Sequence, residues 1–308
     1  MRVFVRVVER GSFSAAAADL HLSHGMASTV VKEIEADLGV QLLRRTTRRM
    51  ALTEEGTAYY DRAVAILAEV DSLRDHLGAG RDVVRGRVTL QAPVAFARLV
   101  LAPSLDQLRE RYPELELAVL GRDQMPDMIV EGIDLLLFTG ALPDSGLMAR
   151  TLATFPVVTV AAPGYLDRHG VPETPEALAG HRLINILSAT NRRPLDWRFR
   201  EGERTELRRL HAPLCLESSE AAVAAAVAGA GIVQNVSYVV AEALAAGRLV
   251  EILPRWRDRG ADLQLVSRQS TAGPNRLRAV AEHLADLAAT RRRDDLRILD
   301  AGAAATES

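Results

Sequence analysis

Hydrophobic positions recur at helical spacing in two short runs at the start of the chain. The first run, within residues 3–8, ends at Gly11. Ser14 is expected to cap a second, alanine-rich helix over Ala15–Leu20, because a serine side chain can accept a hydrogen bond from a free N–H group in the first turn of a helix. Small alanine side chains let another helix cross at close range, as the two helices of a helix-turn-helix do.

A third helix is predicted directly after the tight link His21-Leu22. Ser23 is expected to cap this helix and Gly39 to end it. Its apolar face is expected to hold Met26, Val30, Ile34 and Leu38, at steps of four. In a helix-turn-helix, the second helix enters the DNA major groove with its N-terminal residues against base edges. The predicted groove-facing residues are Ser23, His24, Gly25, Ser28, Thr29 and Lys32.

A run of arginines follows, between the apolar segments Leu42-Leu43 and Met50–Leu52. This order, with Thr46-Thr47 in the middle, predicts a two-stranded hairpin that forms a wing beside the third helix. Arginine suits DNA contact because its planar guanidinium pairs with two phosphate oxygens at once. The alternative is a solvated hairpin tip with no partner. The predicted DNA-contacting arginines are Arg44, Arg45, Arg48 and Arg49.

Residues 54–77 lack proline and contain glycine only at Gly56, which predicts one long helix capped by Thr53. Apolar residues follow the helix at alternating steps of four and three, the spacing of a coiled-coil seam. Such a narrow seam favours a partner helix from a second copy, and packing on the helix's own domain is the alternative. The predicted dimerisation residues are Tyr59, Ala63, Ile66, Val70, Leu73 and Leu77.

From residue 86 onward, short apolar runs alternate with helical patterns, which predicts α/β lobes with largely parallel sheets. The expected strands are Val88–Ala92, Leu115–Leu120, Asp134–Phe138, Val157–Ala161, Ile184–Leu187, Leu214–Leu216, Ile232–Gln234, Leu249–Leu253 and Leu263–Val266. The expected helices are Ala97–Tyr112, Met125–Glu131, Ser219–Ala228, Tyr238–Ala246 and Asn275–Thr290. In such sheets, ligands bind at the carboxyl ends of strands and often between two lobes.

Charge is distributed unevenly along the 308 residues. The formal net charge is −2, yet residues 1–53 hold eight basic and five acidic side chains, a net of +3. A basic segment on an otherwise acidic chain is typical of a nucleic-acid-binding module joined to another domain. Lys32 is the only lysine, so arginine supplies nearly all the positive charge. A chain of this length is expected to form two or three folding units, and 48% hydrophobic residues is an ordinary value for soluble globular proteins.

The sequence argues against several kinds of chemistry. Cys215 is the only cysteine, which rules out an intramolecular disulfide, and the seven histidines show no metal-ligand spacing. Gly229-Ala230-Gly231 lacks the third glycine of a dinucleotide-binding motif, and no serine lies in a nucleophile elbow. We therefore expect no cofactor, no metal and no enzymatic activity. The sequence has no apolar run long enough for a membrane span and no secretory pattern at its start, so a cytoplasmic location is expected.

The first part of the chain resembles the N-terminal winged helix-turn-helix of LysR-type transcriptional regulators. The matching residues are Gly11-Ser12-Phe13, Ala16-Ala17, Leu20, Leu22-Ser23, Ser28, Ile34-Glu35, Leu38-Gly39, Arg45, Leu52-Thr53 and Gly56. Three positions depart from the family pattern: His24 replaces a usual glutamine, Thr29 a frequent basic residue and Leu43 a usual phenylalanine. The first two fall on the predicted groove-facing surface, so they bear on the DNA sequence that is recognised.

The rest of the chain resembles the effector-binding domain of the same family, through segments such as GRVTLQAP, EGIDLLL, PLDWRF and GRLVEILPRW. The resemblance implies the two-lobed α/β fold of periplasmic solute-binding proteins (type 2), with a small-molecule effector between the lobes. It also implies dimerisation through the long helix. The implied organisation is a DNA-binding domain at 1–56, a linker helix and hinge at 57–85 and an effector-binding domain at 86–290, with lobe I at 86–160 and 266–290 and lobe II at 161–265. Residues 291–308 have no counterpart and are expected to be a disordered tail.

Candidate effector-binding residues lie where predicted strands give way to loops or helices. Ser218 and Ser219 precede a helix whose free N–H groups would suit a carboxylate, although either serine can simply cap that helix. A polar pair after the glycine-rich turn replaces residues that are more apolar in relatives. Core packing is the alternative for Phe96. The candidates are Val94, Phe96, Thr139, Ser188, Ser218, Ser219, Gln234 and Asn235.

Three classes of protein are compatible with a two-lobed domain. The first is a bacterial transcription regulator that binds promoter DNA as a homodimer or homotetramer and responds to a polar or carboxylate effector. The second is a solute-binding or transport receptor, against which the basic first domain and the missing export signal count. The third is an enzyme, which would need a catalytic constellation that the sequence lacks. The sequence favours the regulator.

Overall fold

The computed structural model describes residues 1–45, 50–77, 84–128, 130–140, 148–267 and 275–306. The chain divides into two compact units, the first made chiefly of Met1–Asp82 and the second of Val83–Met125 with Asp134–Ser308. In the described part of the chain, no helix is long and apolar enough to cross a membrane.

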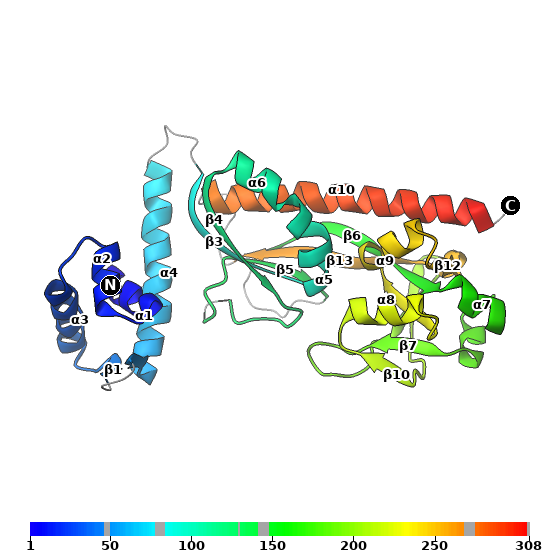
Figure 1. Cartoon of the computed structure of the whole chain (residues 1–308), viewed down its shortest axis with the longest axis horizontal. Coiled ribbons are helices and arrows are strands. Elements are labelled where there is room, and N and C mark those ends of the chain that lie inside the picture. Colours follow the sequence, from blue (N-terminus) through cyan, green and yellow to red (C-terminus); the bar gives the residue numbers. More distant parts are fainter. Residues whose placement is uncertain (46–49, 78–83, 129, 141–147, 268–274, 307–308) are drawn as a thin grey trace. The chain divides into compact units, whose positions relative to one another are not determined.

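The first unit, called the head below, is a helical bundle with a small hairpin (Figure 1). Its elements are α1 (Arg2–Arg10), α2 (Phe13–Asp19), α3 (His24–Leu38), β1 (Leu43–Arg45), β2 (Met50–Leu52) and α4 (Glu54–Leu77). Gly39 ends α3 in the left-handed conformation that glycine adopts without strain, as the sequence predicts. Phe4, Val7 and Val31 have no exposed surface and form the centre of the head's core.

The cap of α2 differs from the prediction. The Ser12 side chain, not that of Ser14, accepts the hydrogen bond from the N–H of Ala15, at 3.4 Å. Ser12 has an extended backbone, the conformation of an N-cap residue, whereas Ser14 already lies inside the helix. The helix therefore begins two residues earlier than Ala15.

The second unit contains a nine-stranded mixed sheet. Its strands are β3 (Arg85–Ala92), β4 (Glu114–Gly121), β5 (Leu135–Thr139), β6 (Met148–Ala161), β7 (Leu183–Ile186), β10 (Leu214–Leu216), β11 (Ile232–Val236), β12 (Val250–Ile252) and β13 (Asp258–Ser267). The strand order is β10-β7-β11-β6-β13-β5-β3-β4, with β12 beside β6. Lobe I contains the parallel strands β3, β4 and β5, and lobe II the parallel strands β7, β10 and β11 together with β12.

The strands β6 and β13 carry the chain between the lobes and are antiparallel to each other. The first part of β6 pairs with β13, and its last part, from Val157, pairs with β11 and β12. The prediction of largely parallel sheets missed this antiparallel pair. The predicted strand began at Val157, whereas β6 begins at Met148. Residues 148–151 have no continuous apolar pattern in the sequence, and they are exposed in the structure.

The helices of the second unit lie on both lobes (Figure 1). They are α5 (Val94–Phe96), the π-helical turn η1 (Ala97–Leu101), η2 (Ala102–Ser104), α6 (Leu105–Arg111), α7 (Pro163–His169), η3 (Glu176–Gly180), α8 (Ser219–Val227), α9 (Ser237–Ala245), η4 (Pro254–Trp256) and α10 (Asn275–Thr306). A separate hairpin, β8 (Trp197–Glu201) with β9 (Arg204–Arg208), was not predicted. The predicted helix Met125–Glu131 is wrong, because the described residues there form turns and no helix.

The predicted disordered tail is also wrong for residues 291–306, which continue α10. Asp295 has no exposed surface and Leu299 is 3% exposed, so this segment packs against the protein. The charged sequence of this segment predicted disorder. The residues that bury it, such as Ser237, lie far away in the chain and could not be assigned as its partners from the sequence.

The lobes meet where the paired strands β6 and β13 pass from one lobe to the other, a place called the crossing of β6 and β13 below. The register of β13 is irregular between Asp258 and Ala261, and Gly260 has φ +124°. A Cβ atom on Gly260 would overlap the carbonyl oxygen of Phe155 and approach the nitrogen of Pro156. The buried Asp258 carboxylate accepts the N–H of Gly260 at 3.1 Å and so holds the irregular turn. Close backbone approach and positive φ both require glycine here.

We predict that Gly260→Ala lowers the free energy of unfolding of the second unit by about 3 kcal/mol, because the added methyl group meets backbone and the residue must keep a strained φ. Gly202→Ala is the matched control: its φ is +60° but nothing lies within 4 Å of the added atom, so a loss of about 1 kcal/mol is expected. Urea denaturation measures both. Equal losses would show that the crossing of β6 and β13 is not tightly packed.

Candidate nucleic-acid interface and effector site

The start of α3 is fixed by the predicted cap. Ser23 has an extended backbone, and its Oγ accepts the N–H of Met26 at 3.1 Å. The His24 ring lies edge-on to Phe13, with 6.2 Å between the ring centroids. All six predicted groove-facing residues keep solvent access, and only Ser28 among them is half-buried.

The buried face of α3 differs from the predicted one. Ala27 and Val31 are fully buried, whereas Met26 is 54% exposed and Leu38 is 47% exposed. Met26 therefore joins the exposed face near the start of the helix, beside the predicted polar residues. An apolar side chain at this position can contact a thymine methyl group in the major groove. The sequence offered no sign of this, because Met26 fits the apolar spacing of the helix.

The wing is attached to α3 through backbone groups. Glu35 Oε1 accepts the N–H groups of Leu42 and Leu43, at 2.8 and 3.0 Å. Thr53 Oγ1 donates to the carbonyl of Gln41 at 2.6 Å and accepts the N–H of Gly56 at 2.8 Å, which caps α4. These contacts join α3, the wing and α4 at one point.

Gly56 completes this junction. A Cβ atom there would overlap the carbonyl oxygen of Leu42. The resemblance identified Glu35, Thr53 and Gly56 as family residues, and the structure assigns each a mechanical role.

The predicted arginines of the wing are only partly described. β1 and β2 form the predicted hairpin, with Arg44 opposite Ala51 and Arg45 opposite Met50. The Arg44 side chain is exposed. The side chain of Arg45, and Arg48 and Arg49 entirely, lie outside the described residues.

Elsewhere in the head, Arg10 pairs with Asp19 at 2.6 Å, and this hydrogen bond holds the pKa of the Asp19 carboxyl below its usual value. This ion pair ties α1 to α2, so Arg10 has an internal role.

The predicted dimerisation seam of α4 divides into two parts. The Tyr59 ring packs edge-on against Phe4, with centroids 5.1 Å apart, and Ala63 is 1% exposed in the head's own core. These two residues therefore serve the head, which corrects the prediction for them. Ile66 and Val70 are 47% and 39% exposed. The side chains of Leu73 and Leu77 lie outside the described residues.

In the second unit, the carboxyl ends of the parallel strands of both lobes point toward the junction of the lobes. β6 runs from lobe I into lobe II, and β5 is parallel to it, since both are antiparallel to β13. β11 is antiparallel to β6 and runs the opposite way. The end of β5 at Thr139 and the end of β11 at Val236 therefore approach the crossing from opposite sides. Ligands bind at such strand ends in α/β folds.

Four candidate effector residues lie at these ends. Val94 is 40% exposed and donates its N–H to Asp123 at 3.1 Å. Thr139 is half-buried at the end of β5, and Ser188 follows β7 in a turn, where its Oγ accepts the N–H of Thr190 at 3.3 Å. Ser218 is exposed and caps α8, with its Oγ 3.2 Å from the N–H of Ala221. Ser218 therefore acts as the N-cap of α8, as one of the two interpretations of the sequence expected.

Three other candidates have side chains engaged within the protein, and the last, Ser219, is half-buried as the first residue of α8. Phe96 has no exposed surface, so the core alternative holds for this residue. Gln234 joins β11 to β8 through both polar atoms: its Oε1 accepts the N–H of Arg198 at 2.7 Å and its Nε2 donates to the carbonyl of Arg198 at 3.0 Å. Asn235 is buried and donates to the carbonyl of Ser219 at 3.1 Å, which holds the start of α8 against β11. The side chains of Gln234 and Asn235 thus have structural hydrogen bonds at the junction.

Carboxylates gather around the start of α8. Burial raises the pKa of Asp123, and the charges of Glu220 and Glu217 raise it further. Glu220 also forms an ion pair with Arg98 of lobe I, which links the two lobes directly. Sequence reasoning missed Asp123, Glu217 and Arg98, because their proximity depends on the lobe arrangement.

A separate cavity of about 640 Å³ lies among η1, α8, α9 and α10. Its lining includes Arg98, Glu220, Val239 and Ile298, and not the predicted residues at Thr139, Ser188 or Ser218. Among the described residues, no group of three or more His, Cys, Asp or Glu side chains is placed to hold a metal ion. Cys215 donates weakly to the carbonyl of Ala212, at 3.4 Å.

A helix-turn-helix head followed along the chain by a two-lobed α/β domain defines a one-component DNA-binding regulator. Residues 1–57 match the family model described as bacterial regulatory helix-turn-helix protein, lysR family, and residues 81–289 match the LysR substrate binding domain. The chain belongs to the LysR family of transcriptional regulators. Membership confirms the predicted fold class and the prediction of a LysR-type transcription regulator, and does not favour a transport receptor.

Individual relatives agree with this assignment. The chain is 35% identical over 266 residues to the HTH-type transcriptional regulator YhjC of Escherichia coli (strain K12). The matched region covers 86% of this chain and 89% of that protein. It is similar to the solved structure of CrgA from Neisseria meningitidis, with 31% identity, a TM-score of 0.60 and coverage of 92% and 96%. Full-length AphB of Vibrio cholerae shares the fold, with 23% identity, a TM-score of 0.57 and coverage of 91% and 95%.

We predict that Glu35→Ala destabilises the head by about 3 kcal/mol, because two backbone N–H groups lose a charged acceptor. Glu33→Ala removes the same charge from an exposed position of the same helix and is expected to cost about 0.5 kcal/mol or less. Thermal unfolding followed by circular dichroism compares the two. A Glu35 variant as stable as the Glu33 variant would contradict the role assigned to Glu35.

Proposed function

We propose that the chain binds duplex DNA through the exposed start of α3 and the wing, and that a polar small molecule at the lobe junction changes this binding. The observation that carries the DNA part is the exposed surface of α3. His24, Gly25, Thr29 and Lys32 are exposed there, on a helix whose other face is buried in the head. Residues at this end of a recognition helix contact base edges.

The wing is proposed to hold the sugar–phosphate backbone. Arg44 is exposed on β1, and the hairpin brings Arg45 to the end of the same strand. Guanidinium groups position a protein on DNA without reading its sequence, whereas contacts to bases specify it. We therefore assign affinity mainly to the arginines and sequence preference mainly to His24, Ser28 and Met26.

Self-association as a dimer or tetramer is proposed to use the second part of the α4 seam. Ile66 and Val70 are exposed apolar residues four apart on one face of the helix, which is the spacing a partner helix would cover. Two heads would then present two recognition helices to a pseudo-palindromic DNA site.

The effector is proposed to carry a neutral polar or cationic group toward the start of α8. The hydroxyl of Ser218 and the N–H groups of α8 would by themselves suit a carboxylate. The carboxylates of Asp123, Glu217 and Glu220 oppose that choice: burial is the main cause of the raised pKa of Asp123, and repulsion from Glu220 and Glu217 raises it further. An amide or an ammonium group would relieve this repulsion, and a carboxylate would add to it.

We predict that neutralising Arg45 and Arg48 together weakens binding to every DNA sequence alike. The slope of the logarithm of the binding constant against the logarithm of salt concentration should fall by about 2, because two phosphate contacts are lost. Gel-shift titrations at several salt concentrations, with specific and random duplexes, measure this. The matched control is a double substitution of Arg109 and Arg204, exposed arginines of the second unit with the same charge change.

Substitution of His24 or Ser28 should instead alter the ratio of specific to random binding and leave the salt slope unchanged. The proposed DNA surface is contradicted if the wing variant binds DNA like its control and the His24 variant keeps the same ratio of specific to random binding.

We predict that amides and amines stabilise the protein more than the corresponding carboxylic acids of the same carbon skeleton. In a thermal-shift panel, a compound at about 100 times its dissociation constant adds roughly 2.7 kcal/mol. Ser218→Ala lowers the ligand-free melting temperature by removing a cap, so the quantity compared is the shift that each compound adds. A panel in which only the acids stabilise the protein, through Ser218, would reverse the assigned effector class.

A further inference from the structure

The helix α10 extends past the part of the chain that the family model covers. That match ends at residue 289, and α10 continues to Thr306. Residues 291–306, called the strap below, therefore extend this chain beyond the region matched to the LysR substrate binding domain. Figure 1 shows α10 as one straight helix along the second unit.

The first part of α10 belongs to lobe I. Leu277, Val280 and Leu284 are buried in the core cluster of the second unit. His283 Nε2 lies 3.0 Å from the Oγ of Ser104, which itself donates to the carbonyl of Leu101. The histidine nitrogen therefore acts as the donor in this pair, and it fixes α10 to η2 of lobe I.

The strap belongs to lobe II. Ser237, the first residue of α9, donates its hydroxyl to Asp295 Oδ2 at 2.6 Å. Arg291 donates to the carbonyl of Tyr238 at 3.0 Å, and its Nε lies 2.8 Å from Asp295 Oδ1, an ion pair without hydrogen-bond geometry. Leu299 is 3% exposed. These contacts anchor the strap to the start of α9.

The strap also contacts the crossing of β6 and β13. Arg292 donates its Nε–H to the carbonyl of Thr154 at 3.0 Å, one residue before Phe155, where Gly260 packs closely. The cavity beside the strap is lined by Arg98 of lobe I, Val223 of lobe II, and Arg291 and Ile298 of the strap. One continuous helix is thus fixed to both lobes. It also lies beside the crossing, where a rotation of one lobe relative to the other would be centred.

We propose that the strap holds lobe II at a fixed angle to lobe I, and that the lobes move relative to one another only when the strap leaves the start of α9. This inference concerns the second unit alone and does not depend on DNA binding by the head.

The physical argument rests on the stiffness of a helix and on the burial of its anchor. A change in lobe angle would separate Asp295 from Ser237 and leave a buried carboxylate without its hydroxyl donor, an arrangement that costs free energy. The straight helix cannot follow both lobes unless it bends or detaches. A strapped domain is therefore expected to occupy one lobe angle, and a released domain to sample several.

The experiment measures the lobe-to-lobe distance in the full chain by double electron–electron resonance. Cys215→Ser removes the only cysteine, and Arg109→Cys and Asp167→Cys place spin labels at exposed positions of lobes I and II. Labelled chain is diluted with unlabelled chain so that distances within one chain dominate. Leu299→Ala, Ser237→Ala and a chain ended after Thr290 release the strap. Arg297→Ala, whose side chain is 81% exposed on the same helix, is the matched control.

We expect one narrow distance distribution in the parent and in Arg297→Ala. Leu299→Ala, Ser237→Ala and the shortened chain should show a shifted mean or an added second distance. If the shortened chain does not fold by circular dichroism, the two point variants decide. Folded point variants whose distributions coincide with that of the parent would overturn the proposal.

Discussion

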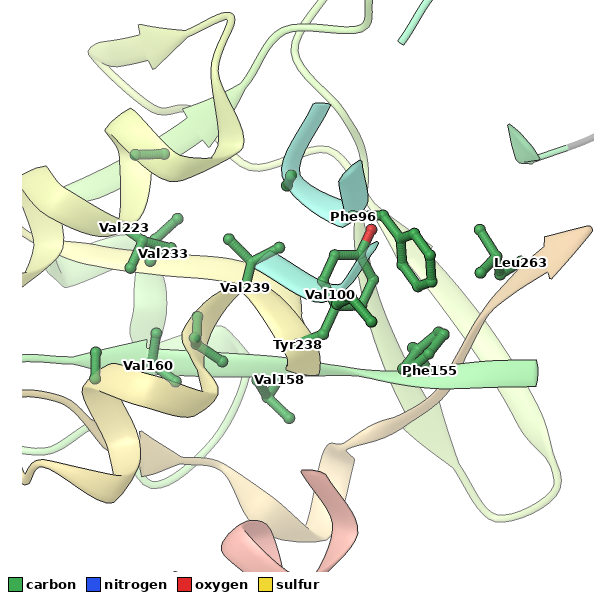
Figure 2. Close-up of a cluster of buried hydrophobic side chains, with 14 of the residues drawn as sticks. Phe96, Val100, Phe155, Val158, Val160, Val223, Val233, Tyr238, Val239 and Leu263 are labelled. Carbon is green, nitrogen blue, oxygen red and sulfur yellow. The ribbon is translucent and has the colours of Figure 1, made fainter. Parts of the chain in front are cut away.

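The contact of Tyr238 with Phe96 and Phe155 is the interaction on which the two-lobed domain depends. The three rings meet edge-on, with centroids 5.0 to 6.3 Å apart, and Figure 2 shows them grouped in the buried cluster. Phe96 comes from lobe I, Phe155 from the crossing strand β6 and Tyr238 from α9 of lobe II. Edge-on aromatic pairs add about 0.5–1.5 kcal/mol each beyond the burial of their surface. The lobes therefore share one core, and the packing of these rings adds to the proposed restraint by the strap.

A comparable constraint governs the head. The exposed start of α3 has a defined position beside the wing because Glu35, Thr53 and Gly56 join α3, the hairpin and α4 through backbone groups. None of these three residues needs to touch DNA to matter for DNA binding. Their role explains why a family pattern can contain residues that lie behind the binding surface, while the residues on that surface, such as His24 and Thr29, depart from it.

The sequence was a good guide wherever local chemistry decides structure. The cap at Ser23, the glycine that ends α3, the hairpin and most strands follow from residue type and spacing. The sequence was a poor guide where distant partners decide. Asp295 was predicted to lie in a disordered tail, but it is buried beside Ser237. Met26 was predicted to lie on the apolar face of α3, but Ala27 and Val31 form the buried face. The carboxylates near α8 were missed for the same reason.

The arginine-rich composition has a chemical consequence for this surface. Every cationic side chain except one is an arginine, and the exception, Lys32, is exposed on α3. Acyl donors that react with side-chain amines thus have a single target, and it lies on the helix that is proposed to enter the major groove. Acylation there would remove the charge and leave one N–H donor in place of three, and the rate of this reaction would report whether the proposed DNA surface is covered.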